Sequence, residues 1–122
     1  MESEGDTMSR DDYFVLVYQI LAYLYTCLKE GQQVDPKYLK PDSPLLGVNE
    51  QYWTYIMVNI LKQGYIEGIT VTKAWGKQSI ISELEACMIT PEGIEYLCDN
   101  SFMQKARQLL KDVGAIAPFI FH

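Results

Sequence analysis

Hydrophobic residues recur at spacings of three and four along the first quarter of the chain, which predicts an amphipathic helix. We expect this helix to begin at Asp11 or Asp12, either of which can act as its N-cap, and to end near Glu30 before Gly31. Its hydrophobic positions form two neighbouring stripes, which indicates a helix contacted on more than one side. The stripes consist of Phe14, Val17, Leu21, Leu24 and Leu28, and of Leu16, Ile20 and Tyr23.

Two further helices are predicted before residue 64. Asp35 followed by Pro36 is typical of a helix start, because proline is tolerated in the first turn, and it predicts a short second helix. Asn49 is a good N-cap for a longer third helix, which is expected to end at Lys62 before Gly64. The residues expected to form its buried face are Trp53, Ile56, Met57, Ile60 and Leu61.

After Gly64 the helical spacing gives way to alternation of β-branched and polar residues, which indicates a β-hairpin. Residues 69–72 are the predicted first strand and residues 79–82 the return strand, with Trp75-Gly76-Lys77 as the turn. We interpret residues 83–88 as a bulged continuation of the return strand.

Two helices are predicted after the hairpin. Thr90 and Pro91 are typical of an N-cap and a first helical position. A last helix is expected to begin near Ser101, where Ser101 and Gln104 match a capping box.

The predicted order is therefore three helices, two strands and two helices. Three helices followed by a hairpin is the arrangement of a winged helix-turn-helix, in which the helix before the hairpin takes the recognition position. The expected fold class is α+β, mainly helical, with a two-stranded β-wing and additional C-terminal helices. We divide the chain into a disordered acidic tail (1–11), a winged-helix domain (12–115) and an apolar C-terminal extension (116–122).

Charge is distributed unevenly along the chain. The net charge is −6, and residues 1–12 contribute −4 of it through five acids and one base, so the remaining chain carries only about −2. A domain that binds nucleic acid through phosphate contacts usually has a clear excess of lysine and arginine. This chain lacks that excess. The residues responsible for the acidic N-terminus are Glu2, Glu4, Asp6, Asp11 and Asp12, with Arg10 as the base.

Neither a metal site nor a catalytic site is predicted. The three cysteines form no CxxC pair and the single histidine is His122, so no zinc-ligand set can be assembled by spacing. An odd number of unpatterned cysteines suggests reduced thiols in a cytoplasmic protein. The close carboxylate pairs, Glu83 with Glu85 and Glu92 with Glu95, are expected to be solvated. We therefore predict no enzymatic activity and no cofactor.

Four segments carry a resemblance to a known family: "LLGVNEQYW" (45–53), "LKQGYIEGITV" (61–71), "ITPEGIEYL" (89–97) and "NSFMQKA" (100–106). Together they resemble the YjcQ-like proteins, a small winged-helix family of Gram-positive bacteria and their prophages. The resemblance implies a winged-helix fold, a cytoplasmic location in a Gram-positive bacterium, and an association with phages or mobile elements.

DNA is one expected type of partner. The outward face of helix 49–63 and the wing at 69–81 offer amide side chains that can contact adenine and lysines that can contact phosphate. The lysines are too few for the roughly six to ten phosphate contacts of a tight binder, so any binding is expected to be weak. The candidate nucleic-acid-facing residues are Gln51, Thr54, Tyr55, Asn59, Lys62, Lys73 and Lys77.

Protein is the second expected type of partner, and we favour it. Hydrophobic residues surround Pro118 after the last helix, and a terminal apolar segment is seldom left in water. We expect this segment to pack on its own domain, on a second copy or on another protein. The first helix is its expected receptor in a homodimer, because one hydrophobic stripe can serve the core while the other remains open. The candidate interface residues are Trp75, Ile116, Phe119, Ile120 and Phe121.

The predicted function is that of a non-enzymatic, phage-associated winged-helix protein that acts through protein contacts. A DNA-binding transcriptional regulator is the alternative.

Overall fold

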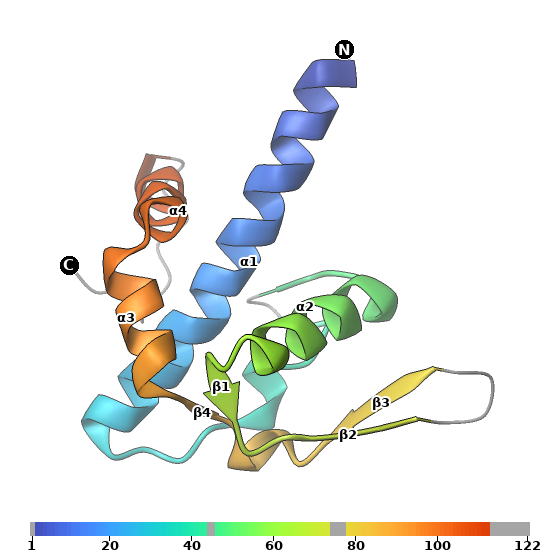
Figure 1. Cartoon of the computed structure of the whole chain (residues 1–122), viewed down its shortest axis with the longest axis vertical. Coiled ribbons are helices and arrows are strands. Elements are labelled where there is room, and N and C mark those ends of the chain that lie inside the picture. The colour runs from blue at the N-terminus through green and yellow to red at the C-terminus, as the bar shows by residue number, and fades with distance from the viewer. Residues whose placement is uncertain (1, 44–45, 74–77, 113–122) are drawn as a thin grey trace.

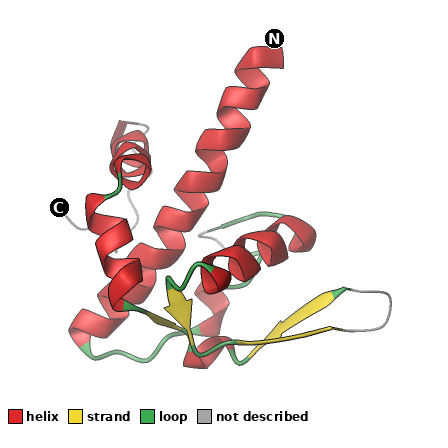
Figure 2. Cartoon of the chain, in the orientation of Figure 1, coloured by secondary structure: helices red, strands yellow, loops and turns green. Residues whose placement is uncertain are grey.

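The computed structural model describes residues 2–43, 46–73 and 78–112, and within them the fold is mainly helical α+β (Figures 1 and 2). Four α-helices account for most of the structure, and the short strands form two separate two-stranded antiparallel sheets, β1–β4 and β2–β3. The elements, in order, are α1 (Glu2–Glu30), the 3-10 helix η1 (Pro36–Tyr38), α2 (Glu50–Lys62), β1 (Ile66–Glu67), β2 (Thr70–Lys73), β3 (Ser79–Ser82), the 3-10 helix η3 (Leu84–Ala86), β4 (Met88–Ile89), α3 (Pro91–Asp99) and α4 (Ser101–Asp112).

Helix α1 is the centre of the molecule, packing against α2, α3, α4 and β4. Most positions of both predicted stripes are buried, which confirms a helix contacted on more than one side. Leu28, at the C-terminal end, is 44% exposed, and Phe14 is half-buried. The expectation that one stripe stays open for another segment is wrong, because both stripes are largely buried within this chain.

The first helix begins at Glu2, so the prediction that it starts at Asp11 or Asp12 is wrong. Its N-terminal end projects beyond the other elements (Figure 1). Two effects favour this extension. A helix that is already nucleated adds residues at little cost, and acidic residues near a helix N-terminus are stabilised by the helix dipole.

The third predicted helix is confirmed as α2. The Asn49 side chain caps it by accepting a hydrogen bond from the Tyr52 backbone N–H at 2.8 Å. The buried residues are Trp53, Ile56, Met57 and Ile60, whereas Leu61 is only half-buried.

The segment between α1 and α2 is held against α2 by one buried hydrogen bond. The Trp53 indole N–H donates to the Leu39 carbonyl oxygen at 2.6 Å. Asp35 and Pro36 do begin a helical turn, as predicted, and the Asp35 carboxylate accepts from the Lys37 backbone N–H at 3.1 Å. The turn is a single 3-10 helix, η1, rather than an α-helix.

The predicted hairpin is confirmed as β2 and β3, in a register that pairs Val71 with Ile81 and Thr72 with Ile80. Val71 and Ile81 are half-buried on one face, while Thr72 and Ile80 are exposed on the other. The bulged continuation proposed for residues 83–88 is wrong. Glu83 has a φ of 64°, which turns the chain into η3, and β4 then pairs with β1.

Helices α3 and α4 lie where the sequence places them, but the cap of α4 differs. The Thr90 hydroxyl accepts from the Gly93 backbone N–H at 2.9 Å, which confirms the cap of α3. At α4 the Asn100 carboxamide oxygen accepts from the backbone N–H groups of Phe102 and Met103 at 2.8 and 3.3 Å. Asn100, and not Ser101, is therefore the N-cap, because its side chain accepts the hydrogen bonds from the first turn of the helix.

Candidate functional site

The outer face of α2 carries the residues predicted to face nucleic acid. Gln51, Tyr55 and Lys62 are exposed, whereas Thr54 and Asn59 are half-buried. The Asn59 amide donates to the Tyr55 carbonyl oxygen at 2.7 Å, so one of its two hydrogen-bond donors is already engaged within the helix. Three of these five side chains on α2 are thus exposed, and one amide donor of Asn59 is taken up within the helix.

Basic residues do not gather around this face. Within the described part of α2 and the β2–β3 hairpin, the bases are Lys62 and Lys73 and the acid is Glu50, so there is no marked basic excess. Lys73 is exposed at the end of β2. Several predicted site residues lie outside the described part of the chain, namely Lys77, Trp75, Ile116, Phe119, Ile120 and Phe121.

Aromatic side chains of α4 and α1 lie next to Tyr55 on the outer face of α2. A chain of ring contacts runs from α4 through α1 to α2. Phe102 stacks on Phe14 with ring centroids 4.5 Å apart, Phe14 meets the edge of Tyr13 at 5.2 Å, and Tyr13 lies 6.3 Å from Tyr55. We call the whole set the aromatic surface, and it consists of Tyr13, Phe14, Tyr52, Tyr55, Tyr65, Tyr96 and Phe102.

The tyrosines of the aromatic surface are also electrostatic neighbours. Tyr65 stacks on Tyr96 of α3 with ring centroids 4.2 Å apart. Burial, together with smaller contributions from nearby Tyr65 and Tyr13, raises the pKa of Tyr96 to about 12. Burial also raises the pKa of Tyr52, with smaller contributions from Asp12, Tyr13 and Tyr55. Tyr52 and Tyr96 are therefore neutral at physiological pH and able to donate and accept hydrogen bonds.

Two of the largest exposed hydrophobic side chains belong to this surface. Tyr55 is 59% exposed and Phe102 is 44% exposed. Large apolar groups gathered on a surface are typical of interaction sites, and tyrosine is enriched among the residues that dominate binding energy. The sequence indicated Tyr55 as a site residue but not the cluster, because Tyr13, Phe14, Tyr96 and Phe102 come from three other helices that are distant in sequence. Only the spacing of Tyr52 and Tyr55, three residues apart on one helix, hinted at the cluster.

One acidic group borders the aromatic surface. Burial raises the pKa of the Asp12 carboxyl, and Asp12 in turn raises the pKa of Tyr52. Among the described residues no cation forms an ion pair with Asp12. Asp12 is thus an exposed residue whose carboxylate is partly desolvated by its surroundings, and within the described part of the chain it has no ion-pair partner.

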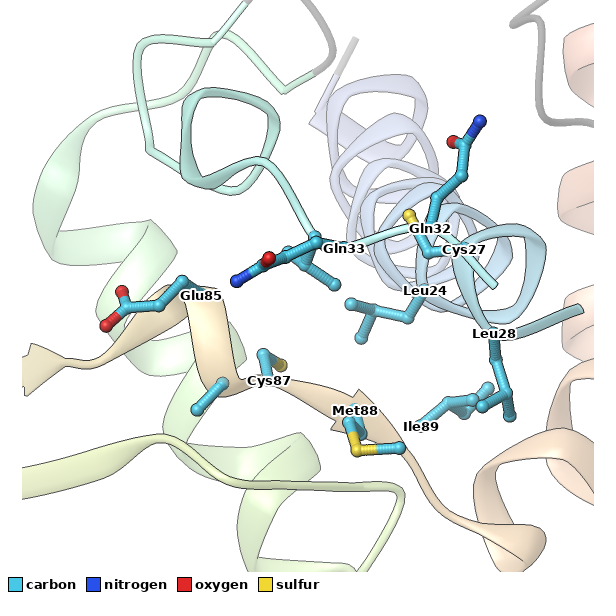
Figure 3. Close-up of a pocket in the computed structure, with 11 residues that line it drawn as sticks. Leu24, Cys27, Leu28, Gln32, Gln33, Glu85, Cys87, Met88 and Ile89 are labelled. Carbon is cyan, nitrogen blue, oxygen red and sulfur yellow. The ribbon is translucent and has the colours of Figure 1, made fainter. Parts of the chain in front are cut away.

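A second feature lies at the other end of α1. A pocket of about 210 Å³ opens between the C-terminal end of α1, the loop that follows it, and the segment from η3 to β4 (Figure 3). Its lining is mostly apolar, and two lining residues, Leu28 and Met88, are 44% and 46% exposed. The residues that line it are Leu24, Cys27, Leu28, Gln32, Gln33, Val34, Glu85, Ala86, Cys87, Met88 and Ile89.

The two cysteines of this pocket are not suited to nucleophilic or metal chemistry. Burial raises the pKa of Cys87 to about 12 and also raises the pKa of Cys27. Both therefore remain protonated thiols at neutral pH, whereas nucleophiles and metal ligands are thiolates. In the part of the chain that the structure covers, no group of three or more His, Cys, Asp or Glu residues is arranged to hold a metal ion.

The raised pKa of Cys87 predicts a loss of stability at alkaline pH. Below its ordinary pKa of 9.0 the thiol is protonated in both the folded and unfolded states. Between that value and about 12 the unfolded chain loses the proton while the folded chain keeps it, so rising pH favours unfolding. We expect the free energy of unfolding, measured with urea, to fall by up to about 1.4 kcal/mol per pH unit in this range. The Cys87→Ala variant should show a shallower slope, and an unchanged slope would contradict the prediction.

None of the helices in the described part of the chain combines the length and hydrophobicity that crossing a bilayer requires.

Comparison with known proteins gives one match. A family model described as "YjcQ protein" matches residues 18–116, which include α2, both sheets, α3 and α4. No curated protein and no solved structure matches the chain.

Proposed function

The chain belongs to the YjcQ family, and from this premise we propose that it is a non-enzymatic binding protein with a winged-helix fold that acts through contacts with other proteins. The order α1, η1 and α2 followed by the β2–β3 hairpin supports the winged-helix assignment, with α2 in the recognition position. The observation that carries the function is the aromatic surface, because it extends the outer face of α2 with partly exposed rings.

Protein contacts fit this surface better than DNA contacts do. A DNA-binding face gains most of its affinity from lysine and arginine at phosphates. Lys62 and Lys73 are the only bases in the described part of α2 and the hairpin, and Asp12 would repel a phosphate placed near Tyr52. Tyrosine supplies a large contact area together with a hydroxyl group, which suits a protein interface.

A DNA-binding transcriptional regulator remains the alternative function. It is supported by the exposure of Gln51, Lys62 and Lys73 on α2 and the hairpin. A homodimer and a phage or mobile-element setting also stay predictions. Because both stripes of α1 are largely covered by this chain, a dimer would need another surface, such as the aromatic surface or the pocket beside Leu28.

The two functions predict different binding behaviour. We expect DNA duplexes to bind more weakly than ~10 µM at ~150 mM salt and to be released as salt rises, because few lysines contact phosphate. Fluorescence anisotropy with random and genomic duplexes measures this. In parallel, protein partners captured by the immobilised chain should be lost with Tyr55→Ala but kept with Ile80→Ala, which changes a 50% exposed side chain on the hairpin. Nanomolar, sequence-selective DNA binding would overturn the proposal.

A further inference from the structure

We propose that the aromatic surface binds an arginine-rich segment of a partner protein, with Asp12 pairing with one of the guanidinium groups. This inference rests on the proposed function and names the chemical class of its partner. It follows from three properties of the surface: exposed ring area, a carboxylate that no described cation pairs with, and an acidic surrounding.

The rings provide the first property. A guanidinium group is planar and weakly hydrated, so it stacks on aromatic faces and is attracted by their electron density. Tyr55 is 59% exposed and its ring lies 6.3 Å from that of Tyr13. Tyr65 and Tyr96 stack at 4.2 Å and are half-buried. Arginine side chains can therefore contact several rings that belong to different helices.

Asp12 provides the second property. Its carboxyl is desolvated enough to raise its pKa, and no described cation pairs with it. A neutral partner that covered this region would desolvate the carboxylate further without compensation, which is unfavourable. A guanidinium group would instead form a charge-assisted hydrogen bond with the carboxylate. The hydroxyl oxygens of nearby tyrosines such as Tyr52 can accept further hydrogen bonds from the same group.

The charge around the surface provides the third property. Helix α3 contributes Tyr96 and carries exposed Glu92, Glu95 and Asp99 with no basic residue. The chain as a whole has a net charge of −6. An acidic field of this kind attracts cationic segments and accelerates their association.

The same charges argue against the other occupants of an aromatic surface. Bases of single-stranded nucleic acid also stack on aromatic rings, but such sites have positively charged grooves for the phosphates. Lys105 borders the surface on the α4 side, beside Phe14 and Phe102. We therefore place the arginine-rich segment toward α2 and α3, over Tyr13, Tyr55 and the Tyr65–Tyr96 stack.

Calorimetric titration of the full-length chain tests the inference. The probe is a short synthetic peptide in which arginine alternates with glycine and serine, and its control replaces each arginine by citrulline, which is similar in shape but uncharged. We expect the citrulline peptide to bind at least about tenfold more weakly. Tyr55→Ala and Asp12→Asn should each weaken arginine-peptide binding several-fold. Tyr55→Phe keeps the ring and should retain most of the affinity.

Two matched variants separate specific binding from general attraction to an acidic protein. Asp42→Asn removes an exposed acid elsewhere, and Ile80→Ala removes an exposed hydrophobic side chain from the hairpin. Both should bind the arginine peptide like the parent chain. Equal binding of the citrulline peptide, or equal weakening by Asp12→Asn and Asp42→Asn, would overturn the inference.

Failure of this inference can be distinguished from failure of the proposed function. If the arginine peptide does not bind but Tyr55→Ala still abolishes capture of a partner protein, the class of partner is wrong and the protein-binding function stands. If capture of every partner is unaffected by Tyr55→Ala, the role of the aromatic surface is wrong, and the proposed function loses the observation that carries it.

Discussion

Ile60→Asp is expected to lower the free energy of unfolding by roughly 3–5 kcal/mol, because it places an unpaired carboxylate in the core. Ile60 is 1% exposed on the face of α2 that packs toward the rest of the molecule, and Ile56 on the same face is equally buried. A loss of this size is a large part of the ~5–15 kcal/mol stability of a typical domain. Urea denaturation followed by circular dichroism measures it.

The matched control is Gln51→Asp, on the exposed face of the same helix. Surface substitutions of this kind usually change stability by less than about 0.5 kcal/mol, and an acid near the helix N-terminus is favourable. If Ile60→Asp and Gln51→Asp unfold at the same urea concentration, the placement of the buried face of α2 is wrong.

Gly68→Ala is expected to destabilise the protein by more than about 3 kcal/mol, for two separate reasons. Gly68 has a φ of +99°, a backbone conformation that strains any residue with a Cβ atom. In addition, a Cβ atom at this position would lie 1.9 Å from the backbone carbonyl oxygen of Ala86. The turn that contains Gly68 would therefore have to move away from η3, which contains Ala86. Thermal and urea denaturation of the variant check this expectation.

Gly64→Ala separates the two reasons. Gly64 has a similar positive φ of +82°, but nothing lies within 4 Å of a Cβ atom placed there. Its substitution should therefore cost only the conformational strain, about 1–2 kcal/mol. If Gly64→Ala and Gly68→Ala lower the free energy of unfolding equally, Gly68 does not lie close to Ala86 in solution.

Several elements were predictable from the sequence because their determinants lie within a few residues of one another. Asn49 and Thr90 act as N-caps through hydrogen bonds to backbone N–H groups three residues later, and this spacing is visible in the sequence. The buried face of α2 follows from the period of its hydrophobic residues, and the β2–β3 hairpin follows from β-branched alternation around a turn. The family was also recognisable from local segments.

Short elements were less predictable. Strands β1 and β4 contain only two residues each, too few to show alternation, and each exists because the other lies beside it. The η3 turn depends on a positive φ at Glu83, a conformation that glutamate seldom adopts. At α4 two adjacent residues, Asn100 and Ser101, could both have served as the cap, and the hydrogen bonds of the folded chain selected Asn100.

The candidate site shows the same division between local and tertiary information. By itself, the sequence determined that Tyr55 lies on the outer face of α2, because the position of a side chain around a helix depends only on the helical period. It could not bring Tyr55 beside Tyr13, or Tyr65 beside Tyr96, since these pairs are separated by tens of residues and meet only when α1, α2 and α3 pack together. The pocket between Cys27 and Cys87 arises in the same way. Caps, periodicity and turn chemistry thus determined which elements form, whereas tertiary packing alone decided which side chains share a surface.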